Sequence, residues 1–203
     1  MVRYAKHARR LWSSEINDAV VGRLAPKPGE TVVDIGAGVG ASTMVAAAAG
    51  AAVIAAEPTG YLRRVLTLRA RLSSERDQIT VVDGSAEATG VADQSANGAW
   101  AVNTMHHWVD VDAALAEFDR IVAPGGRILL VDENFDDPTH PDYERFARSH
   151  QGDGGSADHS HHFDMVDPAT IGEQLTNRGF TVQHAGADTL IGRPVLLVEA
   201  TRP

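Results

Sequence analysis

The chain has 203 residues, of which 43% are hydrophobic and 22% charged, and its net charge is −9. This apolar content suffices for the core of one α/β domain and excludes a disordered chain. The negative charge repels phosphate backbones, so we expect no nucleic acid as a partner. The one basic patch consists of Arg3, Lys6, Arg9 and Arg10, which we expect to be solvated or to close over a bound anion.

The sequence contains no cysteine, which removes disulfides, thiolate metal sites and cysteine nucleophiles together. The N-terminus has no apolar run long enough for a signal peptide, and no stretch of about 20 apolar residues could span a bilayer. We therefore expect a cytoplasmic protein without a membrane partner.

The first predicted helix begins after the capping residues Ser13 and Ser14 and runs to about residue 24, before two prolines and a glycine. Leu11, Trp12 and Ile16 give this end of the chain an apolar face. We interpret residues 1–28 as a helical lid over a site, and a contact in a homodimer is the alternative.

Short apolar segments then alternate with amphipathic ones, without an internal repeat. We expect strands at residues 31–35, 53–56, 79–82, 98–103 and 127–131, and helices at residues 42–50, 61–72 and 112–122. Asp167 and Pro168 predict a further helix start, with a capping carboxylate and a proline in the first turn, and Gly179 ends that helix.

Two last strands, at residues 180–184 and 195–200, are joined through Gly186, Gly192 and Pro194 and predict an antiparallel hairpin. The alternation before them predicts a parallel sheet with helices on both faces. We therefore expect one α/β domain over residues 1–203. It would be a single-domain, Rossmann-like fold with a seven-stranded, mostly parallel sheet that ends in the hairpin.

A glycine-rich loop follows the first predicted strand, with Gly36, Gly38 and Gly40 at alternate positions. Such glycines let the backbone turn tightly and approach a ligand, and the next helix begins at the same place. Gly36, Gly38 and Ala41 also satisfy the pattern of a nicotinamide-binding loop. Asp34 argues against that cofactor, because dehydrogenases usually have an apolar residue at this position.

An acidic residue followed by alternating glycines resembles the first motif of the class I S-adenosylmethionine-dependent methyltransferases. The resemblance covers the chain from about residue 31 to the C-terminus. It implies that Gly36, Ala37 and Gly38 bind S-adenosylmethionine. It also implies that Asp34 orders the loop and meets the methionine end of the cofactor, directly or through water.

Two further acids follow the next strands, where this family would place them. Glu57, beside Pro58, has the position to accept hydrogen bonds from both ribose hydroxyls, because paired carboxylate oxygens match a vicinal diol. The segment that resembles the adenine-lining part of the family is Asp83, Gly84, Ser85 and Ala86. There, Asp83 or the neighbouring backbone would read the exocyclic amine. The alternatives are a solvated loop acid and an ordinary turn.

Adjacent histidines follow the fourth predicted strand, in the segment Asn103-Thr104-Met105-His106-His107-Trp108. This segment is similar to one in the small quinone- and sterol-type branch of the family, and we place Asn103 beside the cofactor. Methylation of exocyclic amines usually goes with an Asn-Pro-Pro-aromatic segment, so the missing prolines argue against that class. His106 or His107 suits removal of a hydroxyl proton, and a structural histidine packed under Trp108 is the alternative.

The segment after the fifth predicted strand is rich in acids and histidines. In one interpretation, Asp132, Glu133 and a histidine hold Mg²⁺, which lowers the pKa of an acceptor hydroxyl. In another, residues 134–166 form an acidic, histidine-rich loop over the acceptor pocket that supplies a base on closing. Glu133 and His162 are then further catalytic candidates. A hydrophilic surface loop without a catalytic part is the third interpretation.

Together these residues predict an S-adenosylmethionine-dependent O-methyltransferase that acts on a small polar acceptor. A sugar or oligosaccharide such as a mannoside is favoured, because acids and histidines suit a polyol and only 5% of the residues are aromatic. The chain also looks similar to small actinobacterial methyltransferases of polysaccharide pathways. The alternatives are a C-methyltransferase of an isoprenoid quinone or lipid, and a non-catalytic cofactor-binding module.

Overall fold

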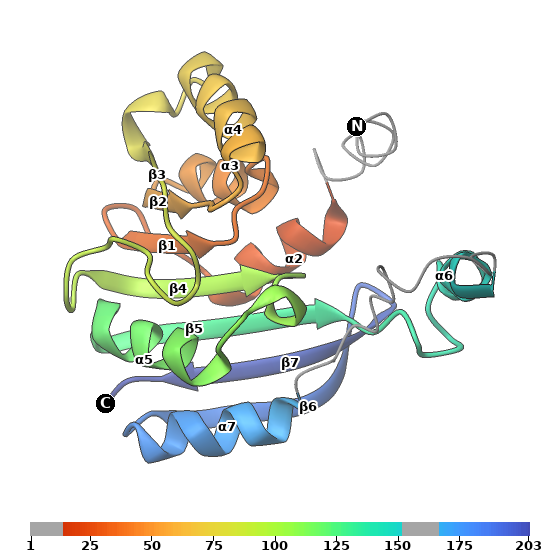
Figure 1. The fold of residues 1–203 in the computed structure, drawn as a ribbon. Helices are drawn as coiled ribbons and strands as arrows, with labels where there is room; N and C mark the ends of the chain where they lie inside the picture. The colour runs from red at the N-terminus through yellow and green to blue at the C-terminus, as the bar shows by residue number, and fades with distance from the viewer. Residues whose placement is uncertain (1–13, 152–166) are drawn as a thin grey trace.

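The fold, taken from a computed structural model that describes residues 14–151 and 167–203, contains one seven-stranded sheet (Figure 1). The strands are β1 (Thr31–Ile35), β2 (Ala52–Ala56), β3 (Ile79–Val82), β4 (Ala96–Val102), β5 (Val122–Glu133), β6 (Thr181–Leu190) and β7 (Arg193–Thr201). Their order is β3-β2-β1-β4-β5-β7-β6, and β7 is antiparallel to both of its neighbours. The other pairings are parallel, which confirms the expected fold class.

Helices cover both faces of this sheet (Figure 1). They are α2 (Glu15–Leu24), α3 (Ala41–Ala48), α4 (Gly60–Leu72), α5 (Val111–Ile121), α6 (Tyr143–Gln151) and α7 (Pro168–Asn177), with the 3-10 turns η1 (Arg76–Gln78) and η2 (Met105–His107). α5 and α7 pack on one face, and α2 and α3 on the other. α4 packs beside α3 at the β3 edge of the sheet. Among the described residues, no helix has the length and apolar character needed to cross a bilayer.

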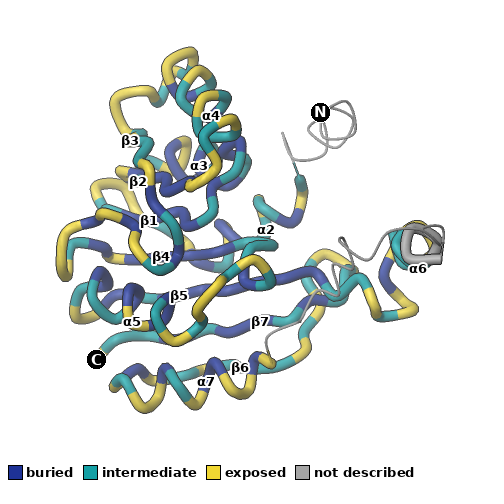
Figure 2. The backbone as a smooth tube through the Cα atoms, viewed as in Figure 1, coloured by how far each residue is buried: buried dark blue, intermediate teal, exposed yellow. Residues whose placement is uncertain are grey.

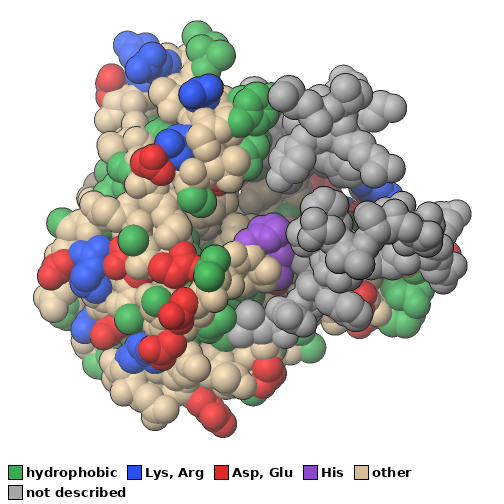
Figure 3. Space-filling model, in the orientation of Figure 1, with side chains coloured by type: hydrophobic (Ala, Val, Ile, Leu, Met, Phe, Trp, Pro, Cys, Tyr) green, Lys and Arg blue, Asp and Glu red, His purple; other side chains and the backbone are tan. Residues whose placement is uncertain are grey.

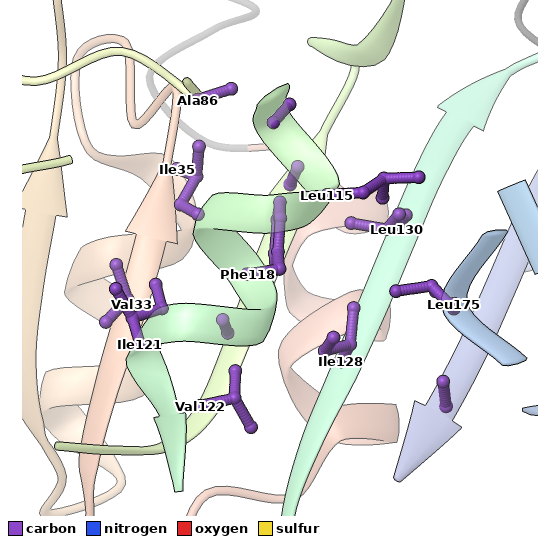
Figure 4. Close-up of a cluster of buried hydrophobic side chains, with 14 of the residues drawn as sticks. Val33, Ile35, Ala86, Leu115, Phe118, Ile121, Val122, Ile128, Leu130 and Leu175 are labelled. Atoms are coloured by element: carbon purple, nitrogen blue, oxygen red, sulfur yellow. The ribbon is translucent and has the colours of Figure 1, made fainter. Parts of the chain in front are cut away.

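The core consists of two apolar layers, one on each face of the sheet. Phe118 of α5 and Leu175 of α7 meet Val33 and Leu130 in the first layer (Figure 4). Val32 points into the second layer, because successive side chains of a strand face opposite sides. The central strands are therefore buried on both faces, and Figure 2 shows most of their residues in the buried class. This explains why their sequences are almost wholly apolar.

α2 differs from the lid predicted for residues 1–28. Ile16 and Leu24 are 1% and 4% exposed, and they pack into the second apolar layer. A helix held in this way is part of the core, so the lid prediction is wrong for residues 15–24. A dimer contact through Ile16 is excluded for the same reason. Outside the described residues lie Arg3, Lys6, Arg9, Arg10, Leu11 and Trp12.

The largest differences from the expected elements lie near the C-terminal ends of the strands. β5 continues through Asp132 and Glu133 because β7 pairs with it along this stretch. Gly186 lies inside β6, and the hairpin turns instead at Ile191 and Gly192, which have φ of 48° and 74°. α6 occupies part of the segment 134–166 that was expected to be a loop. The predicted cap at Asp167 is confirmed, because its side chain accepts hydrogen bonds from the first-turn amides of α7.

Candidate active site

The predicted cofactor and acceptor residues meet at the carboxyl ends of the parallel strands. The strand order reverses between β1 and β4, and α/β sheets bind their ligands at such a point. β1 leads into the glycine loop, β2 into Glu57, β3 into Asp83 and β4 into Asn103. The sheet therefore brings Asp34 and Asn103, which are 69 positions apart in the sequence, to the same edge.

Asp34 ties the glycine loop to the helix that follows it. Its carboxylate is 2% exposed, and Oδ2 accepts hydrogen bonds from the hydroxyls of Ser42 (2.7 Å) and Thr43 (2.6 Å). Burial raises the pKa of Asp34 to about 6, although these two hydrogen bonds lower it. The charge of Glu57 contributes to the rise. These contacts fit the loop-ordering role that the resemblance implies for Asp34.

Gly36 and Gly38 of the loop differ in the space available for a side chain. Gly36 and Gly38 both have positive φ, 70° and 57°. A Cβ atom on Gly36 would lie 2.5 Å from Cγ2 of Thr104, whereas a Cβ atom on Gly38 would meet nothing within 4 Å. The backbone amides of Gly36 and Ala37 donate to the carbonyl oxygen of Ala56. The loop is thus fixed to the sheet while the space beside Gly38 stays open, which fits a bound nucleoside.

Glu57 is a buried acid at the end of β2. It is 4% exposed, which contradicts the alternative of a solvated loop acid. Oε2 accepts from the amide of Gly38 (2.8 Å), and Oε1 accepts from the amide of Thr59 (2.7 Å). Each carboxylate oxygen can accept a second hydrogen bond, so the ribose contact predicted for Glu57 fits this geometry.

Arg63 is a residue that the sequence interpretation missed. Its guanidinium donates to the carbonyl oxygens of Glu57 (2.8 Å) and Pro58 (2.9 Å), and to the carboxylate of Asp83 (2.7 Å). It therefore joins the ends of β2 and β3, where the ribose and adenine contacts are expected. We call this group of contacts the Arg63 clamp. The sequence feature that could have identified Arg63 is its position one turn into the helix that follows Glu57.

Asp132 orients His106. The carboxylate is 2% exposed and accepts hydrogen bonds from the amides of Thr104 (2.9 Å) and His106 (3.2 Å). Nδ1 of His106 lies 2.9 Å from Oδ2 of Asp132. A carboxylate can only accept, so Nδ1 carries a proton in this contact, and in the neutral ring the lone pair is then on Nε2.

The ring of His107 is exposed and lies 4.0 Å from the His106 ring, centroid to centroid. On the face drawn in Figure 3, histidine forms one patch near the middle of the molecule. Of the two histidines left open by the sequence, His106 is thus the one that a buried acid holds in a defined tautomer.

Glu133 connects three segments of the chain. It is 8% exposed and accepts hydrogen bonds from Asn103 (2.9 Å), Arg193 (2.8 Å) and His140 (3.2 Å). The amide of Glu133 donates in return to the side-chain oxygen of Asn103, whose φ is 54°. Nδ1 of His140 accepts from the amide of Asp142, so Nε2 is the donor to Glu133. These contacts tie Glu133 to Asn103, His140 and Arg193, and its catalytic role stays a prediction.

The donor set does not fit the predicted Mg²⁺ site. Magnesium needs near-octahedral oxygen ligands, whereas the oxygens of Asp132 and Glu133 accept from N–H groups. Over residues 14–151 and 167–203, no group of three or more His, Asp or Glu residues is placed to hold a metal ion. His162 lies outside the described residues, as does the rest of 152–166.

Comparisons with known proteins point to methyltransferases. Residues 33–130 match the family described as a methyltransferase domain. The chain is 32% identical over 111 residues to methyltransferase GfsG of Streptomyces halstedii, which covers 54% of this chain and 40% of that protein. It is 32% identical over 120 residues to demethylmenaquinone methyltransferase of Corynebacterium kroppenstedtii, covering 59% and 48% respectively. The chain thus spans less than half the length of these two curated relatives.

The fold is also that of solved methyltransferases. The structure of geranyl diphosphate C-methyltransferase from Streptomyces coelicolor superimposes with a TM-score of 0.69, covering 94% of this chain and 79% of that chain. The identity is 16%, so this likeness concerns the fold alone. Residues 33–130 thus match a methyltransferase domain, and both the relatives and the fold support a class I S-adenosylmethionine-dependent methyltransferase.

Proposed function

We propose that this protein transfers a methyl group from S-adenosylmethionine to a hydroxyl of a small polar acceptor. The observation that carries the proposal is the 2.9 Å contact between Nδ1 of His106 and Oδ2 of Asp132. It provides an oriented base at the strand end next to the cofactor loop. A hydroxyl acceptor needs a base to remove its proton, whereas a more acidic acceptor does not need one.

The cofactor would lie along the three acids at the ends of β1, β2 and β3. Asp34 meets the methionine end, Glu57 the ribose, and the segment of Asp83 the adenine. The Arg63 clamp holds the second and third of these sites in register. When bound, S-adenosylmethionine supplies a methyl carbon that is open to in-line attack by a nucleophile.

His106 would act on the acceptor. Nε2 accepts the proton of the acceptor hydroxyl while the oxygen bonds to the methyl carbon and the carbon–sulfur bond breaks. The resulting imidazolium has Asp132 as its counter-ion at 2.9 Å, and the proton then passes to water. Glu133 keeps Asn103 in its left-handed conformation beside this site. No divalent cation is needed for these steps.

A sugar or oligosaccharide, such as a mannoside, is the first acceptor to test. The histidines and Asn103 offer hydrogen bonds that suit a polyol. With aromatic residues at 5% of the chain, few rings are present to stack on a quinone. The contrary case has its own support, since one relative is named a demethylmenaquinone methyltransferase. The chemistry at the labelled atom decides between the two.

The test is an acceptor screen with methyl-labelled S-adenosylmethionine, followed by mapping of the labelled position. The panel contains mannosides, other sugars and polyols, and demethylated quinones, each with and without EDTA. We expect label on an oxygen of a hydroxyl acceptor, at a rate that EDTA does not change. Label on a carbon atom would contradict O-methylation. A protein that binds S-adenosylhomocysteine but labels no acceptor would be a cofactor-binding module.

A further inference from the structure

α4 has an apolar surface on its outer side as well as on its buried side. Tyr61, Leu68 and Leu72 are 65%, 60% and 78% exposed. Their spacing of seven and eleven residues places them within about 20° of one line along the helix, at about 100° per residue. Leu66 and Ala70, on the opposite side, are buried and attach α4 to the body of the protein. We call Tyr61, Leu68 and Leu72 the α4 stripe.

Arginines accompany the α4 stripe. Arg64 and Arg71 are exposed, and their spacing puts both on the same flank of the stripe. The helix contains no acidic residue, although the whole chain has a net charge of −9. Beyond its end, Arg76 and Asp77 of η1 balance each other at 3.8 Å. In Figure 3, basic and hydrophobic side chains accordingly gather at the top of the molecule, where Figure 1 places α4.

Three exposed side chains set a limit on what can cover this surface. A standard protein interface needs about 800 Å² from each partner, much more than one stripe on one helix provides. A second copy of the chain packed through α4 would also bring Arg64 and Arg71 close to the same arginines of the partner. Both the size and the charge of the patch therefore disfavour a dimer.

We propose that the α4 stripe docks on an anionic membrane surface. Apolar side chains of such a helix enter the boundary between headgroups and acyl chains, and the flanking arginines meet lipid phosphates. Acids elsewhere on the protein act weakly on this contact, because salt screens charges beyond about 8 Å. The contact is peripheral and reversible. It revises the expectation that no membrane is a partner, and it does not depend on the proposed methyl transfer.

The test is cosedimentation of the full chain with vesicles of phosphatidylglycerol and phosphatidylcholine, against vesicles of phosphatidylcholine alone. We expect binding to the anionic vesicles only, and release by high salt. The double variants Leu68→Gln/Leu72→Gln and Arg64→Gln/Arg71→Gln each lower the partition coefficient by about tenfold or more. Ile191→Gln is the matched control, since Ile191 is also a large exposed apolar residue (51%) but lies on the β6–β7 turn.

Three results would overturn the proposal. The first is no binding to anionic vesicles. The second is equal binding by the double variants and the Ile191→Gln control, which would assign the contact to another segment. The third is a wild-type dimer in light scattering that Leu68→Gln/Leu72→Gln makes monomeric. Melting temperature and affinity for S-adenosylhomocysteine stay at wild-type values in all variants, so a failure here is separable from a failure of methyl transfer.

Discussion

The buried charge of Asp34 destabilises the free protein, and the variant Asp34→Asn removes that charge. Asp34 is 2% exposed, and burial raises its pKa to about 6 against the effect of two hydroxyl donors. Both hydroxyls, from Ser42 and Thr43, bind the same oxygen, Oδ2. An asparagine with its carbonyl oxygen in that place keeps both hydrogen bonds.

The expected size of the effect follows from the pKa. A rise from 3.8 to about 6 corresponds to about 3 kcal/mol of unfolding free energy. The folded protein holds this proton more tightly than the unfolded chain does. The stabilisation by the proton is therefore complete below the unfolded pKa and is lost as the pH rises through about 6. Asp34→Asn has no proton to lose at this position. Its free energy of unfolding relative to wild type therefore increases by up to about 3 kcal/mol between about pH 4 and pH 7.

Urea unfolding of both proteins across this pH range measures the difference, and other titrating groups cancel in the comparison. Calorimetry with S-adenosylhomocysteine provides the second readout. The variant binds the ligand about tenfold less tightly, because a neutral amide replaces the acid at the methionine end. A stability difference that stays constant from about pH 4 to pH 7 would refute the reasoning about the buried charge.

Three further substitutions test individual contacts of the site. Arg63→Met breaks the Arg63 clamp and lowers affinity for S-adenosylhomocysteine about tenfold in calorimetry, whereas Arg64→Met has no effect; equal effects would contradict the clamp. Gly36→Ala lowers the melting temperature more than Gly38→Ala does, because only the former creates a 2.5 Å contact; the reverse order would be inconsistent with the loop geometry. Glu133→Gln destabilises the protein by about 3 kcal/mol in urea unfolding, and EDTA leaves the rate of the wild-type protein unchanged; a wild-type rate that EDTA lowers would restore the metal role.

Local signals made most of the fold predictable. The expected strands at residues 31–35 and 79–82 have the bounds of β1 and β3, because an apolar run between turn residues determines each of them. The start of α7 was equally readable, since Asp167 caps it through its own neighbours. The glycine loop, the acid near the end of β1 and the acid directly after β2 form a motif of short range. Such features are encoded by residues that lie close together in the chain.

Features that depend on distant partners were not predictable. Asp132 and Glu133 read as polar loop residues, yet pairing with β7 places them in β5 and hydrogen-bond donors from other segments satisfy them. Arg193 is 60 positions from Glu133, and no spacing rule connects the two. The choice between His106 and His107 had the same limit, since only the folded position of Asp132 distinguishes them.

The kinetics of His106→Ala test the central claim, that an Asp132-held histidine removes the proton of the acceptor, most directly. Two quantities are measured for each variant: kcat/KM for the hydroxyl acceptor found in the labelled screen, and the dissociation constant of S-adenosylhomocysteine. His107→Ala is the neighbouring control. We predict that His106→Ala loses about 100-fold or more in kcat/KM while its affinity for S-adenosylhomocysteine stays within about threefold of wild type. Turnover close to wild type in His106→Ala, or an equal loss in His107→Ala, would contradict the account.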